Sequence, residues 1–211
     1  MNHLLILSTD AQQYTELLKP YALDQLIIHT APSPKLDAVN LQDINLVLAD
    51  PPWLAKILPQ LPKLQWAQST YAGVNTLCAP GLRTDYLLTN VKGVFGQLMS
   101  EYVFAYILAL ERDLLRAYQQ QMQQQWRPFP YRSLAGLKIG IAGLGDIGQH
   151  LASTAKHFGM YVTGLKLTAA TVPQVDEVYS FEQLSEFLTD LDYLVITLPA
   201  TPLTQHLFNA N

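Results

Sequence analysis

Short apolar runs, separated by segments of helix length, recur through the first 95 residues of the chain. This spacing predicts the buried strands of a parallel α/β sheet, in which a covering helix follows each strand. The expected strands are Leu4–Leu7, Leu26–Ile28, Leu46–Ala49, Leu64–Gln68 and Tyr86–Asn90, with a helix over 12–18. Residues 1–95 are therefore predicted to form one α/β domain.

A longer helical pattern covers residues 96–120. Its apolar residues recur at helical spacing, and charged residues such as Glu101 and Arg112 exclude a membrane span. The apolar positions outnumber those that one buried face needs, which predicts a homodimer through this helix. The glutamine-rich tract over 119–125 is interpreted as an exposed helix end or loop, and 126–133 as a linker.

The alternation of strands and helices returns after residue 136. The expected strands are Leu137–Ala142, Met160–Leu165 and Tyr193–Leu198, with helices over 146–158 and 181–188. Together with the long helix, these elements predict a second α/β domain over residues 96–211.

Composition and charge narrow the class of protein. Hydrophobic residues make up 49% of the 211 residues, and the net charge of -4 lacks the basic surplus of a nucleic-acid binder. The single Cys78 fits a reducing compartment, and the apolar run at the N-terminus is too short for a signal peptide. With no apolar stretch of membrane-spanning length, a soluble, cytoplasmic protein is expected, with neither a membrane nor a nucleic acid as partner.

The chemistry centres on a glycine turn, Gly143-Leu144-Gly145-Asp146-Ile147-Gly148, which matches G-x-G-x-x-G. A predicted strand precedes it, a helix follows it and another strand comes next, which is the context that a dinucleotide-binding turn requires. Gly143 permits the tight turn, Gly145 lets backbone amides approach a pyrophosphate, and Gly148 lets the helix pack closely. The helix N-terminus then stabilises the phosphate charge. The alternative is a glycine turn without a ligand.

The end of the next strand bears on the choice of cofactor. An acidic residue there would accept hydrogen bonds from the ribose of NAD. This chain has Lys166, Leu167 and Thr168 instead, and no carboxylate before Asp176. A cation pairs with a 2′-phosphate, so NADP is favoured over NAD, unless Lys166 only points into solvent.

Several linked segments resemble the D-isomer-specific 2-hydroxyacid dehydrogenases. Residues 136–149 (GLKIGIAGLGDIGQ) are similar to the family's nucleotide-binding core, and 191–204 to its next strand and "LPxTxxT" loop. Upstream, 68–75 (QSTYAGVN) resembles its substrate loop, and 89–95 with 100–103 resembles the hinge into the long helix. Within the family, the glyoxylate/hydroxypyruvate reductases are the most similar group.

The resemblance implies a flavodoxin-like substrate domain over 1–95 and a partial Rossmann doubly wound parallel sheet over 96–211. It implies hydride transfer between NAD(P)H and a small 2-oxo or 2-hydroxy acid, in a homodimer. Ala72 and Gly73 would offer backbone N–H groups to the substrate carboxylate. The implied cofactor-binding residues are Gly143, Gly145, Asp146, Ile147, Gly148, Lys166, Thr168, Leu198, Pro199 and Thr204; no metal is expected.

The family's catalytic arginine, acidic residue and histidine lie downstream of its "LPxTxxT" loop, and nothing in this chain matches them. The five histidines, His3, His29, His150, His157 and His206, lack the family's partner pattern, so no catalytic residue is assigned. Little or no turnover is expected of the 211 residues alone. The expected explanation is a shortened gene product, a proteolytic fragment or the ordered part of a longer chain, with an unpaired sheet edge.

Two other functions stay open at this point. A non-enzymatic dinucleotide-binding module, or an inactive fragment of such an enzyme, needs only the residues present. Another Rossmann enzyme, such as an amino-acid dehydrogenase, would share the glycine turn but would not account for the loop over 68–75.

Overall fold

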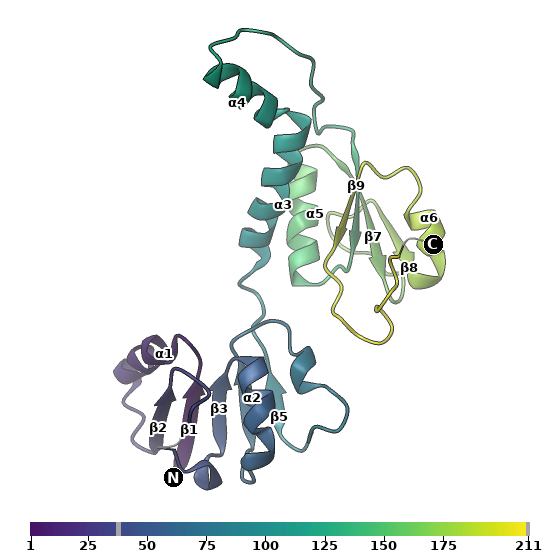
Figure 1. The fold of residues 1–211 in the computed structure, drawn as a ribbon. Helices are drawn as coiled ribbons and strands as arrows, with labels where there is room; N and C mark the ends of the chain where they lie inside the picture. The colour runs from purple at the N-terminus through teal and green to yellow at the C-terminus, as the bar shows by residue number, and fades with distance from the viewer. Residues whose placement is uncertain (37–38, 210–211) are drawn as a thin grey trace. The chain divides into compact units, whose positions relative to one another are not determined.

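The computed structural model describes residues 1–36 and 39–209 and divides the chain into two units, residues 1–92 and 93–211. Each unit holds its own parallel sheet (Figure 1). The assignment of a substrate domain to 1–95 and a cofactor domain to 96–211 stays a proposal. Among the described residues, no helix combines the length and the apolar character needed to cross a membrane.

The first unit is a five-stranded parallel sheet in the order β2-β1-β3-β4-β5. Its strands are β1 Asn2–Leu7, β2 Leu26–Ala31, β3 Leu46–Ala49, β4 Trp66–Ser69 and β5 Leu87–Thr89, and its helices are α1 Ala11–Leu18 and α2 Pro51–Ile57. This order is the flavodoxin-like doubly wound order. The fold class expected from the sequence is therefore confirmed for this unit.

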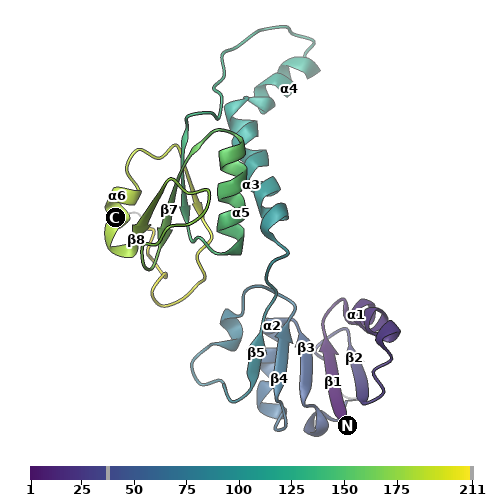
Figure 2. The same cartoon turned by 180° about the vertical axis from the view of Figure 1, so that it is seen from behind.

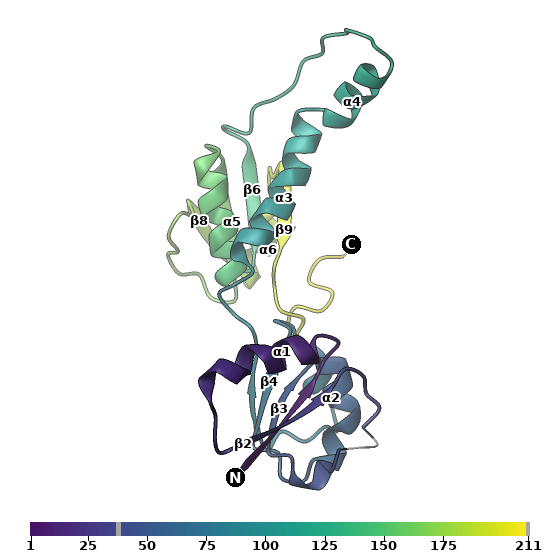
Figure 3. The same ribbon diagram turned by 90° about the vertical axis from the view of Figure 1, so that its left-hand side faces the viewer.

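The two faces of this sheet are covered by different helices. Leu5 and Leu7 belong to the core cluster that contains Leu54 and Ile57 of α2, whereas the fully buried Ile6 alternates to the other face. Figure 3 shows α1 and α2 on opposite sides of the strands. Burial on both faces explains why these strands are continuous apolar runs in the sequence.

The second unit is a four-stranded parallel sheet in the order β8-β7-β6-β9. Its strands are β6 Lys138–Ala142, β7 Tyr161–Lys166, β8 Glu177–Ser180 and β9 Tyr193–Ile196, and its helices are α3 Gly96–Glu111, α4 Leu114–Met122, α5 Asp146–His157 and α6 Leu184–Phe187. Helices α3 and α5 lie side by side on one face (Figure 1), and α6 covers the other (Figure 2). The strand order corresponds to 3-2-1-4, the first four strands of a Rossmann sheet.

Two sequence predictions were wrong here. The helix expected over 96–120 is two helices, because Asp113 takes the left-handed conformation with φ of 48° and ends the first. Strand β8 was not predicted, since Glu177–Ser180 is short and only half-buried at the sheet edge, so its apolar signal is weak.

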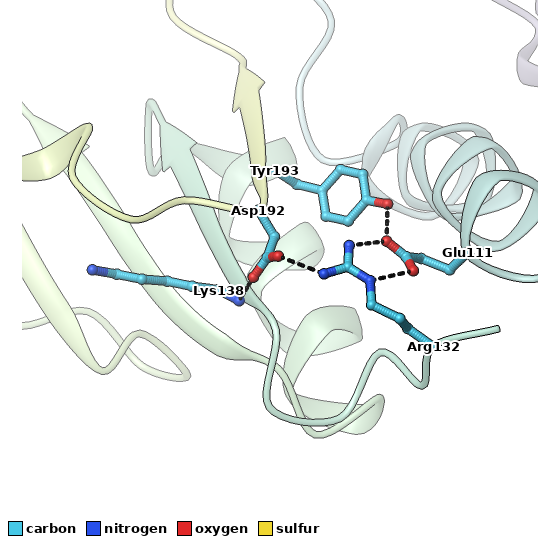
Figure 4. A network of polar contacts seen from close by, with 5 residues as sticks. All are labelled: Glu111, Arg132, Lys138, Asp192 and Tyr193. Carbon is cyan, nitrogen blue, oxygen red and sulfur yellow. Dashed lines mark hydrogen bonds and ion pairs between the residues drawn. The ribbon is translucent and has the colours of Figure 1, made fainter. Parts of the chain in front are cut away.

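A polar network holds the end of α3 against the sheet (Figure 4). The Arg132 guanidinium donates two hydrogen bonds to the Glu111 carboxylate, at 2.9 and 2.6 Å, and one to Asp192 at 3.1 Å. The Tyr193 hydroxyl donates to Glu111 at 2.6 Å, and the Lys138 N–H donates to Asp192 at 2.9 Å. The network therefore joins α3, the segment after α4, and the amino ends of β6 and β9.

Candidate functional site

The glycine turn lies where the winding of the second sheet reverses. Strand β6 pairs with β7 on one side and with β9 on the other, so the chain crosses over at the carboxyl ends of β6 and β9. Ligands of doubly wound sheets bind outside the carboxyl ends of the strands at this switch point. Gly143 directly follows β6 there, and Gly145 caps α5.

Each of the three positions in the turn is a glycine for a different physical reason. Gly143 has φ of 99°, and a Cβ on it would lie 2.9 Å from the backbone nitrogen of Leu198. A Cβ on Gly148 would lie 2.0 Å from the Gly143 oxygen, so helix α5 packs on the turn only without a side chain. At Gly145 a Cβ would meet nothing within 4 Å. The protein needs the outer two glycines for itself, whereas Gly145 leaves open space for a ligand.

Two carbonyl oxygens of this turn accept hydrogen bonds from side chains. Thr197 Oγ1 donates to the Gly143 oxygen at 2.7 Å, and Gln149 Nε2 donates to the Leu144 oxygen at 3.0 Å. The N–H groups of Gly145, Asp146 and Ile147 have no acceptor in the described part of the chain. Free amides at the N-terminus of a helix, with the positive end of the helix dipole behind them, stabilise an anion such as a pyrophosphate.

The carboxyl end of β7 offers a cation and no acid. Lys166 ends the strand, and the exposed Thr168 follows two residues later. Within residues 1–36 and 39–209, no carboxylate forms an ion pair with Lys166. The place that an acidic residue takes in an NAD site therefore carries a positive charge.

Asp176 is turned away from this position. Its carboxylate accepts hydrogen bonds from the N–H of Val162, near the start of β7, at 2.7 Å and from Lys156 at 2.9 Å. Burial raises the pKa of Asp176, but these two donors outweigh burial and lower it. Asp176 thus lies at the amino end of β7, the opposite end of the strand from the switch point.

The segment after β9 closes the other side of the switch point. Thr197 N donates to the Ala142 oxygen at 2.8 Å, which brings Leu198, the residue before Pro199, next to Gly143. Thr204 is engaged in the loop itself, since its hydroxyl donates to the Pro199 oxygen at 2.5 Å and accepts from Thr201 N at 2.9 Å. Of the predicted cofactor residues, the structure thus gathers the glycine turn and 198–199 at one place.

In the first unit, Ala72 and Gly73 lie in the loop after β4. The Tyr71 oxygen accepts from Ser69 Oγ at 2.8 Å, and the Ala72 oxygen accepts from Asn90 Nδ2 at 2.6 Å. The N–H groups of Ala72, Gly73 and Val74 have no acceptor in the described ranges, and Ala72 and Gly73 are exposed. Free amides with occupied carbonyls are again the arrangement that binds an anion.

In the described part of the chain, none of the histidines is ion-paired with a carboxylate. His150 Nδ1 lies 2.9 Å from the hydroxyl of the buried Ser100 and fastens α5 to α3. His3 and His29 are paired with each other at 3.3 Å. The prediction that no histidine serves as a catalytic residue stays untested by these contacts.

Four residues of the candidate sites escaped sequence reasoning: Ser69, Asn90, Gln149 and Thr197. Each is polar and lies inside a segment that matched the family pattern. Asn90 and Thr197 leave no local pattern, because they bond carbonyls 18 and 54 residues away. Ser69 and Gln149 bond carbonyls two and five residues away, so the only further signal was a polar residue beside a turn.

Residues 104–211 match the family described as "D-isomer specific 2-hydroxyacid dehydrogenase, NAD binding domain". Glyoxylate/hydroxypyruvate reductase A of Serratia proteamaculans is 34% identical over 117 residues, which are 54% of this chain and 36% of that protein. A glyoxylate reductase of Pyrococcus horikoshii is 25% identical over 164 residues, 73% of this chain and 49% of that protein. The matches thus cover less than half the length of these relatives.

Two solved structures extend the likeness to nearly the whole chain. A D-isomer specific 2-hydroxyacid dehydrogenase family protein from Aeromonas salmonicida is 42% identical, with a TM-score of 0.89, over 99% of this chain and 67% of that one. An NADPH-dependent glyoxylate/hydroxypyruvate reductase from Sinorhizobium meliloti, in complex with NADP and sulfate, shares the fold at 24% identity and a TM-score of 0.81. It is covered over 64% of its chain, against 97% of this one.

Proposed function

This chain belongs to the D-isomer-specific 2-hydroxyacid dehydrogenase family, and from that premise we propose that it serves hydride transfer between NAD(P)H and a small 2-oxo acid of the glyoxylate or hydroxypyruvate type. One observation carries the proposal: free backbone amides at a glycine turn at the switch point of the second sheet. The names of the related reductases support the substrate class.

The residues present fit a nicotinamide dinucleotide. Gly145 leaves open space, and the amides of Gly145, Asp146 and Ile147 are available to its pyrophosphate. Gly143 and Gly148 keep strand and helix close enough for this contact, while Leu198, Pro199 and Thr204 would line the cofactor from the segment after β9. The bound cofactor would supply the hydride, and the protein's part is to bind and orient it.

NADP is the proposed form of the cofactor. Lys166 stands where an NAD site has an acid, and Thr168 adds a hydroxyl beside it. A cation there attracts a 2′-phosphate, while the nearest acid along the chain, Asp176, is occupied at the other end of β7. Three similar solved structures, in complex with NADP or NADPH, agree with this preference.

The substrate carboxylate is proposed to bind the amides of Ala72 and Gly73. Exposed amides next to a glycine let a small anion reach the backbone, as this loop does. No arginine or histidine in the 211 residues matches the family's catalytic pattern. We therefore expect the chain by itself to bind the cofactor with little or no turnover.

A homodimer is the proposed assembly. Helix α3 carries exposed apolar residues four positions apart, Leu98, Tyr102, Tyr106 and Leu110, and after the break at Asp113 helix α4 carries Leu114, Tyr118 and Met122. Exposed apolar residues gathered on neighbouring helices are typical of a protein interface.

Fluorescence titration with NADPH and NADH tests the cofactor proposal. We expect tighter binding of NADPH, and Lys166→Ala should weaken it by about tenfold, a loss of about 1.4 kcal/mol, while NADH binding changes little. Lys56→Ala, which removes an exposed lysine from α2, is the control. Equal binding of both cofactors by the unmodified chain would remove the NADP preference, and binding of neither would remove the proposed function.

The absorbance of NADPH in the presence of glyoxylate tests whether the chain by itself catalyses the reaction. We expect that the 211-residue chain binds NADPH but oxidises it no faster than a sample without protein. Steady glyoxylate-dependent oxidation of NADPH would contradict this expectation, because it would mean that a residue of the 211 serves as the acid–base group.

A further inference from the structure

Side chains bond two carbonyl groups of the loop that follows β4. Asn90 Nδ2 donates to the Ala72 oxygen at 2.6 Å, across 18 residues of sequence. Ser69 Oγ donates to the Tyr71 oxygen at 2.8 Å and accepts from Tyr71 N at 2.9 Å. Both carbonyl oxygens therefore have donors that the protein itself provides.

The loop is also anchored on its amino side. Thr70 N donates to the Ala49 oxygen at 3.0 Å, and the Thr70 hydroxyl donates to the buried carboxylate of Asp50. Val91 N adds a second, longer bond to the Tyr71 oxygen at 3.4 Å. The peptide units before and after the loop are thus fixed to β3 and to the end of β5.

Three amide groups of the loop, unlike these carbonyl groups, have no hydrogen-bond partner among the described residues. In the part of the chain that the structure describes, the N–H groups of Ala72, Gly73 and Val74 have no acceptor, and a Cβ on Gly73 would meet nothing within 4 Å. A peptide plane has its N–H and C=O on opposite sides, so fixing one group fixes the direction of the next. Occupied carbonyls hold successive amides ready for one negatively charged ligand, which is how a backbone nest binds.

We propose that Asn90, together with Ser69, is a positioning residue that aims the amides of Ala72 and Gly73 at the carboxylate of a small acid. The inference rests on the proposed function, because it concerns the same substrate loop. Asn90 suits this part because its amide nitrogen donates without adding charge. With its oxygen turned to Ala72 the contact would be repulsive, which fixes the direction of the side chain.

Binding of oxalate, a small dicarboxylate probe, can be measured by NMR on isotope-labelled protein with residues 1–211. We expect saturable shifts of the Ala72 and Gly73 amide resonances in the unmodified chain, and binding at least about tenfold weaker in Asn90→Ala. Asn2→Ala, which truncates an exposed asparagine at the start of β1 and outside the substrate loop, should bind as the unmodified chain does. Sodium chloride at equal ionic strength controls for general salt effects.

Two additions keep the test decisive. Asn90→Leu keeps a side chain of similar size but has neither a donor nor a charge, so it should lose binding even if Asn90→Ala destabilises the loop. The carbonyl carbon shift of Ala72 reports the hydrogen bond from Asn90 directly and should change in both variants without any ligand.

Each outcome has one meaning. Oxalate binding by Asn90→Ala and Asn90→Leu as tight as in the unmodified chain would overturn the positioning role but leave the substrate loop in place. An Ala72 carbonyl carbon shift that is unchanged in both variants would also overturn the positioning role. No response of the unmodified chain to oxalate would overturn both the positioning role and the proposed carboxylate site, while NADPH titration separately decides the cofactor part.

Discussion

At the scale of single residues, both candidate sites use the same device. Thr197 and Gln149 occupy the carbonyl oxygens of the glycine turn, as Ser69 and Asn90 do in the loop of the first unit. A carbonyl oxygen that faced an anion would repel it. A hydrogen bond that turns the carbonyl oxygen toward a side-chain donor therefore favours anion binding, as a free amide does. The polar side chains around these loops therefore shape charge recognition without carrying charge.

The glycines of the turn give a prediction that separates binding from folding. Gly145→Ala places its Cβ in open space at φ of -75°, so folding should be unchanged or gain up to about 1 kcal/mol. Cofactor affinity should still fall by about tenfold or more, because the methyl group stands where the pyrophosphate approaches. Urea unfolding and NADPH titration measure the two effects.

Gly148→Ala is the matched comparison. Its Cβ would lie 2.0 Å from the Gly143 oxygen, so the packing of α5 on the turn must shift at a cost of about 1–3 kcal/mol. The same urea and NADPH measurements apply. A stable Gly148→Ala variant, or a Gly145→Ala variant with full affinity, would contradict this division of roles between the glycines.

At the scale of elements, α3 is fixed at its two ends by different chemistry. Near its start, a Cβ on Gly96 would lie 2.9 Å from His150 of α5, and Ser100 bonds the same histidine. Phe104 stacks on Phe158 at 5.1 Å further along. At the end, Glu111 enters the network of Arg132, Asp192 and Tyr193 (Figure 4). Packing and polar bonds thus act on one helix at different points.

The network predicts a pH dependence of stability. The hydrogen bond from Arg132, and then that from Tyr193, lowers the pKa of Glu111 in the folded protein. The stabilisation is therefore fully present above the unfolded-state pKa of about 4.3, and it is lost as the pH falls through the lower folded-state pKa. Glu111→Gln should be less stable than the unmodified chain at pH 7, and the difference should shrink below about pH 4.3 in urea unfolding. A difference independent of pH would contradict this account.

Tyr193→Phe tests the hydroxyl alone. Loss of its 2.6 Å hydrogen bond to the buried Glu111 should cost about 0.5–1.5 kcal/mol in the free energy of unfolding. Tyr179→Phe is the control, because its hydroxyl bonds Glu177, which is exposed. An equal cost in both variants would show that burial of the carboxylate adds nothing to the network.

At the scale of the whole molecule, α3 has two apolar faces. Phe104 and Ile107 are buried against α5 and the sheet, while Tyr106 and Leu110 are 59% and 68% exposed on the outer side. A helix that is apolar all round is normally covered on all sides. The surplus face is the physical basis of the proposed homodimer.

The substitution Tyr106→Glu with Leu110→Glu should weaken this dimer by about tenfold or more, because two like charges would meet their copies across the interface. Light scattering at several concentrations should then give a mass nearer the 23.6 kDa of one chain. Leu17→Glu, at a residue 60% exposed on α1, is the control and should leave the mass unchanged. An unmodified chain that is monomeric at all concentrations would contradict the proposed homodimer.

The sequence by itself determined the features that depend on local order along the chain. Apolar runs placed eight of the nine strands of the described residues to within a few residues. The spacing of Gly143, Gly145 and Gly148 located the turn, because a glycine turn between strand and helix is recognisable from consecutive residues. The parallel α/β class followed from the same alternation.

Only the tertiary structure decided what depends on residues far apart. It broke the long helix at Asp113, added the edge strand β8, and turned Asp176 away from the cofactor end of β7. It also brought Asn90 to Ala72 and Thr197 to Gly143 across the sheets. Such contacts come from strand order and register, which place the ends of different strands together and leave no periodicity in the sequence.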